Sequence, residues 1–426
     1  MWSKISQVWK QPDLRNSILK VLGLLLVARV LAHIPIPGVD LDKLRQFFQS
    51  NQMLGMMNVF SGGTMQNFSV ATLGLGPFIT ASIILQLLGM IVPQLDELSK
   101  EGEQGQQKIN QYTRLLTVPL ALFSAYGMIA LLRQSSGVLT DMSAFRLAVT
   151  MLTMSAGTIF MMWLGELITE AKVGNGISIL IFAGIVSRMP SLVSQVSTTF
   201  DVAQITTYVA YLVIAVLTVA GVVIISEAQR NIPVTYAKIV RGAGTAGGGV
   251  NTHLPLRVNM AGVIPIIFAI SIVMFPPMVA QFFTHAKTAW VVGAAKWVIA
   301  AFQNQTYYGI AYFVLVFAFT YFYTSIVFKP AQIAENLQKQ GGYVPGIRPG
   351  KPTADYLTFV ANRITLAGAV AISLIAVLPL IIQHFVTGSR NLVIGGSSLL
   401  IVVSVALEIV RQVDSQLTMR EYEDVK

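Results

Sequence analysis

The chain has 426 residues, of which 54% are hydrophobic and 11% are charged, and its formal net charge is +10. Soluble domains carry about 25% charged residues, so this composition excludes a soluble protein and indicates an integral membrane protein. The basic residues are spread thinly over loops and form no arginine-rich arm, which argues against sequence-specific nucleic-acid binding. The absence of cysteine excludes disulfides and thiol catalysis.

Ten apolar segments follow one another along the chain, each about 20 residues long, as a hydrocarbon layer about 30 Å thick requires. Their runs are continuous rather than alternating, which excludes a β-barrel. The run at 290–302 is short and has Lys296 at its centre, so it predicts a helix that lies on the membrane surface. We expect an all-α fold with ten transmembrane helices, at 18–34, 76–92, 115–132, 147–167, 177–196, 205–225, 260–279, 309–327, 364–385 and 392–413.

Lysine and arginine are distributed unevenly between the two sides that these spans define. With the N-terminus inside, the inner segments hold twenty of these residues and the outer segments hold eight. Basic loops remain on the cytoplasmic side of a membrane. Both termini are therefore predicted to be cytoplasmic.

The spans divide the chain into two halves of five helices. The predicted parts are a cytoplasmic segment at 1–16, a first half at 17–200, a second half at 201–413 and a cytoplasmic tail at 414–426. Spans five and ten begin with similar residues, NGISILIFAGIV from Asn175 and GGSSLLIVVSVA from Gly395, yet they cross in opposite directions. This pattern indicates an inverted 5+5 repeat with a functional path between the halves.

Two inner loops, at 226–258 and 328–363, are much longer than the others. Basic, turn-rich loops of this kind are either docking surfaces for a bulky partner or simply solvated connections, and the sequence leaves both interpretations open.

The spans contain few groups that could carry out chemistry. Glu166, Glu170 and Glu408 lie toward cytoplasmic helix ends, whereas an ion-coupled transporter keeps charged groups deep in its spans. The four histidines lie far apart in the sequence, so no metal site is expected. A G-x-G-x-x-G pattern at 242–247 has no βαβ unit around it and predicts no nucleotide site. Because no paired catalytic groups occur, we expect neither an enzyme nor a cofactor.

Apolar, mostly β-branched side chains recur beside glycine and proline at helix starts that interrupt the spans. Residues four apart share a helix face, so two of these starts can each present a pair of side chains to one point. From spacing alone, ordinary core or lipid-facing residues explain the same pattern. The positions are Leu75, Ile79, Ile177, Ile181, Ile267 and Ile401.

Seven stretches, each at an expected span or loop, together resemble the SecY family, whose members are channel subunits of the protein-export machinery. The resemblance implies an hourglass pore that passes unfolded secretory polypeptides and releases signal peptides and transmembrane helices sideways into lipid. A secondary transporter with discontinuous helices is the alternative. The stretches are HIPIPGVD at 33–40, FSGGTMQNFSVATLGLGPFITASIILQLL at 60–88, KINQYTRLLT at 108–117, WLGELITEAKVGNGISILIFAGIV at 163–186, NTHLPLRVNMAGVIPIIFAISIVMFP at 251–276, IAENLQKQGGYVPGIRPGKPT at 333–353 and GGSSLLIVV at 395–403.

The resemblance also implies roles for particular residues. The six aliphatic positions above match a ring that seals the pore, because a narrow apolar girdle holds water and ions poorly. The segment 61–74 matches a short plug helix in the outer funnel, with Ser61, Gly62, Gly63, Thr64, Phe68, Val70 and Leu73 as its candidate residues. The second and seventh spans match a lateral gate, with the candidates Thr80, Ser82, Gln86, Asn259, Ser271 and Phe275.

The same resemblance implies partners and a location. It predicts small membrane subunits, SecE and SecG, and it predicts that the long inner loops dock the motor ATPase SecA and the ribosome. Arg348 is the best single contact and Arg241 the second. The loop 237–250 carries glycine where the family commonly has more basic residues, so the balance between SecA and the ribosome stays open. The expected location is the bacterial inner membrane, with signal peptides and nascent proteins as clients.

Overall fold

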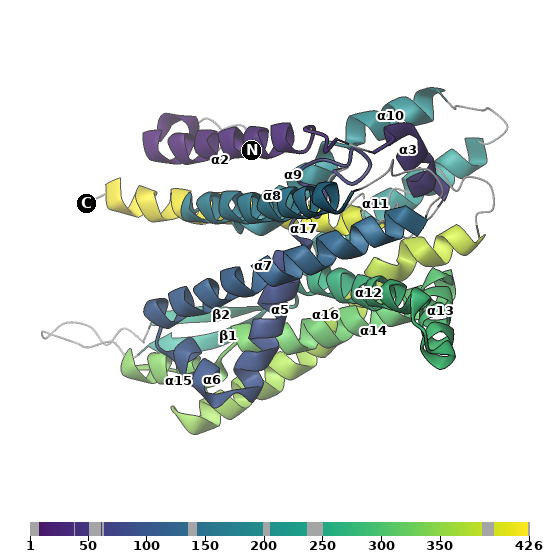
Figure 1. Cartoon of the computed structure of the whole chain (residues 1–426). Helices are drawn as coiled ribbons and strands as arrows, with labels where there is room; N and C mark the ends of the chain where they lie inside the picture. The colour runs from purple at the N-terminus through teal and green to yellow at the C-terminus, as the bar shows by residue number, and fades with distance from the viewer. Residues whose placement is uncertain are drawn as a thin grey trace, which may run out of the picture.

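The computed structural model describes residues 8–37, 39–50, 61, 64–134, 143–198, 205–236, 250–385 and 396–424. Within these residues the chain is mostly helical, and most of the long helices run side by side in one general direction (Figure 1). The helices are α2 (Pro12–Leu31), α3 (Leu41–Ser50), α5 (Gly76–Ile91), α6 (Pro93–Lys100), α7 (Glu103–Gln134), α8 (Ala144–Glu170), α9 (Gly176–Val186), α10 (Met189–Thr198), α11 (Ile205–Glu227), α12 (Ile264–Phe282), α13 (Ala289–Gln303), α14 (Gln305–Val327), α15 (Pro330–Lys339), α16 (Lys351–Phe385) and α17 (Gly396–Asp424).

Each of the ten predicted spans overlaps a helix or, for 177–196, the consecutive helices α9 and α10. Among the described residues, five helices are long and apolar enough to cross a membrane, and the pair α5 and α6 adds a sixth if it is taken as one span bent by 102°. The run at 290–302 lies in a separate helix, α13, and its predicted position on the membrane surface stays a prediction. The arrangement of all ten segments as crossings therefore stays a prediction.

Short apolar helices are one reason why fewer than ten of the described helices are long and apolar enough to cross a membrane. The 16 residues of α5 and the 11 residues of α9 correspond to about 24 Å and 17 Å at 1.5 Å per residue. Neither helix alone reaches across a hydrocarbon layer about 30 Å thick. Both helices start at the interruptions by glycine and proline that the sequence showed, and these starts lie in the protein interior.

The expectation of an all-α fold is wrong in one region. β1 (Gln229–Tyr236) and β2 (Val250–Arg257) form an antiparallel hairpin, and β3 (Gly342–Tyr343) pairs with the other edge of β1. The pairing begins with Gln229 opposite Arg257. The described part of the long inner loop predicted at 226–258 therefore forms two paired strands.

The two long inner loops meet in one small core. Residues of β1 and β2 pack against α15 and against the first turns of α16, which belong to the second loop. The sheet is half buried, so its side chains alternate between this core and the surface. The buried members of the core are Ile232, Val234, Leu256, Leu337, Val344, Leu357 and Val360. Both loops thus fold as a single unit with a packed interior.

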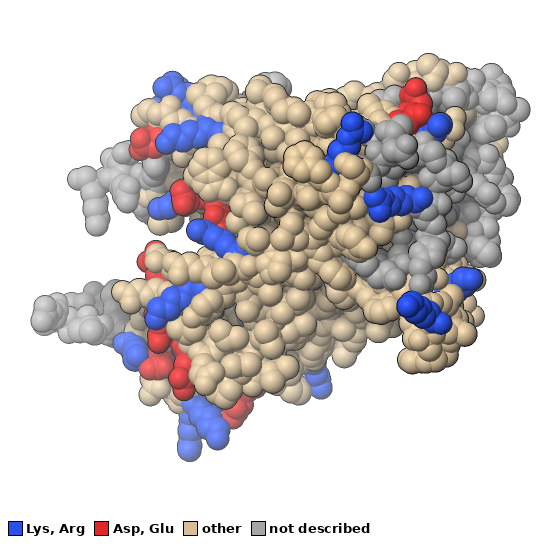
Figure 2. Space-filling view, in the orientation of Figure 1, with Lys and Arg blue, Asp and Glu red and all other residues tan. Residues whose placement is uncertain are grey.

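Charged side chains gather at two ends of the face shown in Figure 2, and a broad band of uncharged residues separates them. The hairpin, α6 and α15 lie at one end, where α17 also finishes, whereas α3, α10 and α13 lie toward the other end (Figure 1). An uncharged band between two polar ends suits a protein embedded in a membrane. We call the end with the hairpin the inner end and the opposite one the outer end.

Candidate functional site

The first element of the candidate site is the start of α5. Pro77 occupies the first turn, where a missing backbone N–H costs no helical hydrogen bond. The backbone amide of Ile79 donates to the carbonyl oxygen of Leu75 at 3.0 Å. The side chains of Leu75 and Ile79 therefore lie one turn apart, and both are buried.

The second element is the start of α9, which depends on a Gly-Asn-Gly sequence. The side chain of Asn175 caps the helix by accepting from the backbone amide of Ile177 at 3.1 Å. Gly176 lies so close to α8 that an added Cβ atom would come within 1.8 Å of the carbonyl oxygen of Gly165. This close approach fixes the direction in which Ile177 and Ile181 point.

The third and fourth elements are the starts of α12 and α17. The side chain of Asn259 accepts from the backbone amide of Gly262 at 2.9 Å, in a turn where Gly262 has a φ of +68° that favours glycine. This turn leads into α12 and places Ile267 in the interior. α17 begins at Gly396 and carries Ile401, which is completely buried.

The structure brings the six predicted ring positions together in one hydrophobic cluster. Five of them are buried members of this cluster, and Ile177 is a partly buried residue packed against it. They come from helix starts that are far apart in the sequence. We call Leu75, Ile79, Ile177, Ile181, Ile267 and Ile401 the ring.

A cavity of about 190 Å³ adjoins the ring. Four ring residues form part of its wall, together with Arg29 of α2 and Phe123 of α7. Residues of the predicted plug and of the predicted lateral gate line the same space: Ser61, Thr64, Leu73, Thr80, Ser271 and Phe275. The ring, the segment before it and the seam between α5 and α12 therefore share one cavity.

The prediction of a plug helix over 61–74 is wrong for the described part of that segment. Residues 64–75 form consecutive turns, and Phe68 has a φ of +42°. The hydroxyl of Thr72 donates to the carbonyl of Ser69, and the amide of Ser69 donates to the carbonyl of Thr64. Such local bonds from serine and threonine compete with helix formation. Gly62 and Gly63 lie outside the described residues.

Apart from Leu75, which belongs to the ring, these residues form what we call the turn segment (64–74), and they are held from two sides. The amide of Ile36 donates to the carbonyl of Phe68 at 2.8 Å, and the amide of Val70 donates to the carbonyl of Ile34 at 3.0 Å. On the other side, a Cβ atom on Gly157 of α8 would come within 2.0 Å of the carbonyl oxygen of Val70. Phe68 is fully buried in a second hydrophobic cluster outside the ring.

The six candidates for the lateral gate fall into two groups. Thr80, Ser271 and Phe275 line the shared cavity. The remaining three make local contacts: Gln86 donates from Nε2 to the hydroxyl of Ser82 at 3.0 Å along α5, and Asn259 bonds within its own turn. α5 and α12 are in direct contact, as a seam between them requires.

Of the two predicted docking residues, the structure describes one. Arg348 is exposed in the turn between β3 and α16, and its carbonyl accepts from the hydroxyl of Thr353 at 2.8 Å. Gly346 and Gly350 on either side have φ values of +82° and +93°, so the turn has a defined shape. Arg241 lies outside the described residues.

Several contacts in this region could not be predicted from the sequence. Arg188 donates from Nη2 to Oε1 of Gln66 in the turn segment at 3.4 Å, although the two residues are 122 positions apart. The close contact of Gly157 with Val70 likewise joins parts of the chain that are far apart in the sequence. No spacing rule connects such positions, and glycine inside a predicted helix was the only available signal.

Interrupted helices that start at a buried apolar cluster beside a cavity define a class, namely helical membrane proteins of the channel type. Comparisons with known proteins narrow this class. The model of the SecY family matches residues 69–410. The chain is 41% identical over 439 residues to the protein translocase subunit SecY of Streptomyces griseus, covering 99% of both proteins, and 41% identical over 432 residues to that of Mycobacterium bovis, covering 96% of both. The chain belongs to the SecY family.

Solved structures agree on the fold. A structure described as that of a protein conducting channel matches with a TM-score of 0.63 at 15% identity, covering 92% of this chain and 90% of the other. A structure of Sec61 from the canine ribosome-channel complex matches with a TM-score of 0.61 at 15% identity, over the same shares. These likenesses place the arrangement of helices in the SecY type of channel fold.

Proposed function

We propose that this chain is the central protein-conducting subunit of a translocase and that unfolded polypeptide passes through the ring. The observation that carries this proposal is the convergence of six aliphatic side chains from four interrupted helices into one cluster beside a cavity. An apolar girdle excludes ions but makes no directional bonds, so it can spread around a chain of any sequence and close again. The comparisons give no support to the alternative, a secondary transporter.

The turn segment supports a revised account of the predicted plug. Hydrogen bonds to residues 34–36 and the close contact with Gly157 hold residues 64–74 beside the ring. We propose that this segment is the fixed support of the seal. Thr64, Phe68, Val70 and Leu73 would act as its anchor points.

The seam between α5 and α12 is the proposed lateral gate. Thr80, Ser271 and Phe275 face the shared cavity from the two sides of this seam. The hydroxyls of Thr80 and Ser271 donate to carbonyls of their own helices, at Gly76 and Ile267 respectively. Because these bonds do not cross the seam, opening it breaks none of them. A signal peptide or a transmembrane helix could leave the cavity here toward lipid.

The folded unit at the inner end is the proposed docking site for partners. Its sheet, α15 and the turn around Arg348 form a packed surface with an exposed basic side chain. We propose that SecA and the ribosome bind here and that SecE and SecG complete the membrane complex. In this proposal the chain lies in the bacterial inner membrane and crosses it ten times as an inverted 5+5 repeat. Both termini then lie in the cytoplasm.

A disulfide experiment tests the proposed path directly, because the chain has no cysteine of its own. One cysteine replaces Ile79 or Ile401, and a second is placed in a secretory polypeptide that is arrested during export. We expect a disulfide at both ring positions. The control is a cysteine at Leu212, which lies exposed on α11 and is expected to form none. Absence of cross-links at every ring position, with export intact, would contradict the proposal.

A further inference from the structure

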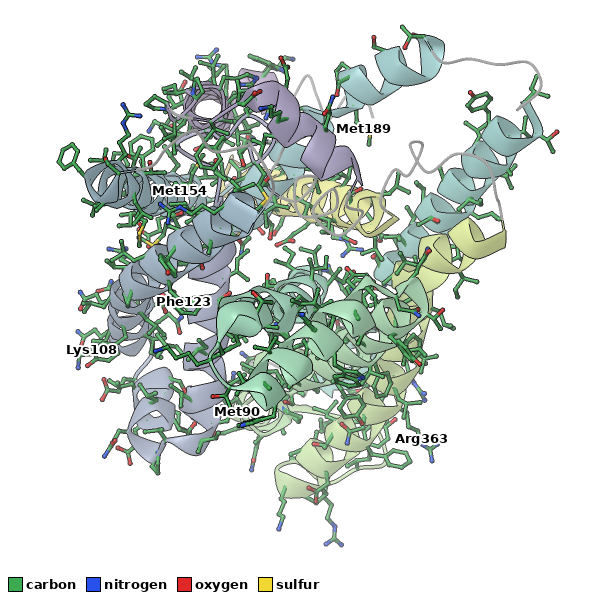
Figure 3. All side chains as sticks on the ribbon, turned by 45° about the vertical axis from the view of Figure 1, so that its right-hand side comes forward. Met90, Lys108, Phe123, Met154, Met189 and Arg363 are labelled. Atoms are coloured by element: carbon green, nitrogen blue, oxygen red, sulfur yellow. The ribbon has the colours of Figure 1, made fainter. Side chains whose placement is uncertain are left out.

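Arg188 occupies an unusual position at the outer end of the molecule. It follows α9 and lies next to Met189, the first residue of α10, which is labelled in Figure 3 at the end of the molecule where α3 and α10 lie. Its side chain is only partly exposed. Nη2 donates to the neutral amide of Gln66 at 3.4 Å, which is a long hydrogen bond. Nη1 is buried and has no hydrogen-bond partner among the described residues.

A second arginine adds positive charge to the same region. Arg29 of α2 lines the cavity beside the ring, and it lies close enough to Arg188 for the two positive charges to repel each other. Among the described residues, no ion pair joins Arg188 to an acidic side chain. Asp40, an acidic residue that the structure describes before α3, accepts from the amide of Lys43 at 3.2 Å and forms an ion pair with that lysine.

Burial removes water from a guanidinium and so costs desolvation free energy. A single hydrogen bond to a neutral amide offsets little of this cost. A carboxylate would serve better, since it can accept two parallel hydrogen bonds from a guanidinium and cancels its charge. Arg29 lines the cavity, whose walls are largely apolar, and its positive charge therefore acts strongly inside that cavity. The local chemistry therefore favours binding of an anionic group over a neutral or basic one.

We infer that Arg188, with Arg29 adding to its field, is a specificity-determining site for acidic side chains of the polypeptide that passes the ring. An aspartate or glutamate that emerges on the outer side replaces Gln66 as the partner of Arg188, while a lysine at the same place is repelled. The site thus favours the forward passage of acidic segments. This inference rests on the proposed function.

The test uses three secretory polypeptides that differ only in a short cluster of Asp, Asn or Lys behind the signal sequence. Their rates of translocation are measured in vesicles that contain the complete membrane complex and its motor. Relative to the unaltered chain, R188Q is expected to lower the ratio of the Asp rate to the Asn rate by about two- to fivefold, the range typical of partly exposed ion pairs. Arg188→Lys should keep part of the preference, and added salt should weaken it.

Two further variants separate recognition from structural support. R146Q removes an exposed arginine near the outer start of α8 and should leave the ratio unchanged. Gln66→Leu removes the amide that competes for Arg188, so the preference for Asp should persist or increase. If R188Q slows all three polypeptides equally, or if Gln66→Leu reproduces its effect, Arg188 only supports the turn segment and the inference is overturned. If the unaltered chain passes none of the three, the proposed channel fails as well.

Discussion

The ring and the turn segment lie next to each other on the same cavity, yet they are held by different forces. The ring consists of aliphatic side chains whose contacts are apolar packing alone. The turn segment is held by backbone hydrogen bonds to residues 34–36, by its own serine and threonine hydroxyls, and by a glycine contact too close for any other residue. Apolar packing depends on volume, whereas hydrogen bonds depend on direction.

This difference indicates which part of the seal can deform. Aliphatic side chains that lose one set of neighbours can contact another apolar surface, such as a passing polypeptide, at little cost. A turn whose carbonyls lose their partners in a buried place leaves unsatisfied polar groups, each of which costs about 1–3 kcal/mol. We therefore expect the ring to open and the turn segment to stay in place. The following substitutions test this contrast from the largest expected effect to the smallest.

The ring should be sensitive to lost volume and tolerant of changed shape. Ile401 is fully buried, so Ile401→Ala should lower the free energy of unfolding by about 2–5 kcal/mol and increase ion leakage. Ile401→Leu conserves volume and should cost less than about 1.5 kcal/mol. Thermal unfolding of the purified complex and ion flux across vesicles measure the two effects. Equal losses in both variants would mean that the ring requires one exact shape.

The turn segment should not tolerate even one added methyl group. Gly157→Ala forces a Cβ atom against the carbonyl oxygen of Val70, and overpacking of this kind costs about 1–3 kcal/mol. The matched control is Gly23→Ala, also within a helix, where no atom lies within 4 Å of the added Cβ. This control should be neutral or stabilising because alanine favours helix more than glycine does. Similar unfolding temperatures for the two variants would show that the contact between Gly157 and Val70 is not rigid.

Loss of a single hydroxyl in the turn segment should have the smallest effect of the three. Thr72→Val preserves the shape of the side chain but removes the buried bond to the carbonyl of Ser69, so the free energy of unfolding should fall by about 1 kcal/mol. Thr153→Val is the control, because that threonine is exposed on α8 and bonds to Val149 of its own helix. Denaturant or thermal unfolding compares the two, and an equal effect would contradict a special role for the Thr72 bond.

The burial of the six ring positions could be predicted from the sequence, whereas their role as a ring stays a prediction. Its residues stand beside glycine, proline and asparagine at helix starts, and those residues have specific physical tasks that the structure shows, such as the cap by Asn175 and the close approach of Gly176. The resemblance to a family then selected these positions from many other aliphatic residues. Their convergence was beyond any local pattern, because it depends on how four helices pack.

Neither the hairpin nor the turn segment was predicted from the sequence, and the two failures have different physical origins. The hairpin was visible in principle, since Ile232 and Val234 stand two residues apart, as do Leu254 and Leu256 in the partner strand, and a period of two predicts a half-buried strand. A proline separates the two residues of each pair, and proline weakens the strand pattern. The turn segment was not visible in the sequence. Serine and threonine side chains can bond to the nearby backbone or leave it free to form a helix, and tertiary contacts decide between the two. Those contacts involve Ile34, Ile36 and Gly157, which are distant in the sequence.

A pair of cross-links tests the contrast between ring and turn segment most directly. Pro35 and Ser69 form an antiparallel bridge, and in bridges of this type the Cα atoms are close enough for a disulfide. We predict that a chain carrying Pro35→Cys and Ser69→Cys still translocates polypeptide after oxidation. A chain whose ring is joined by a short thiol reagent between Ile79→Cys and Ile401→Cys should not translocate. Translocation that stops when residues 35 and 69 are linked, and returns on reduction, would contradict the account.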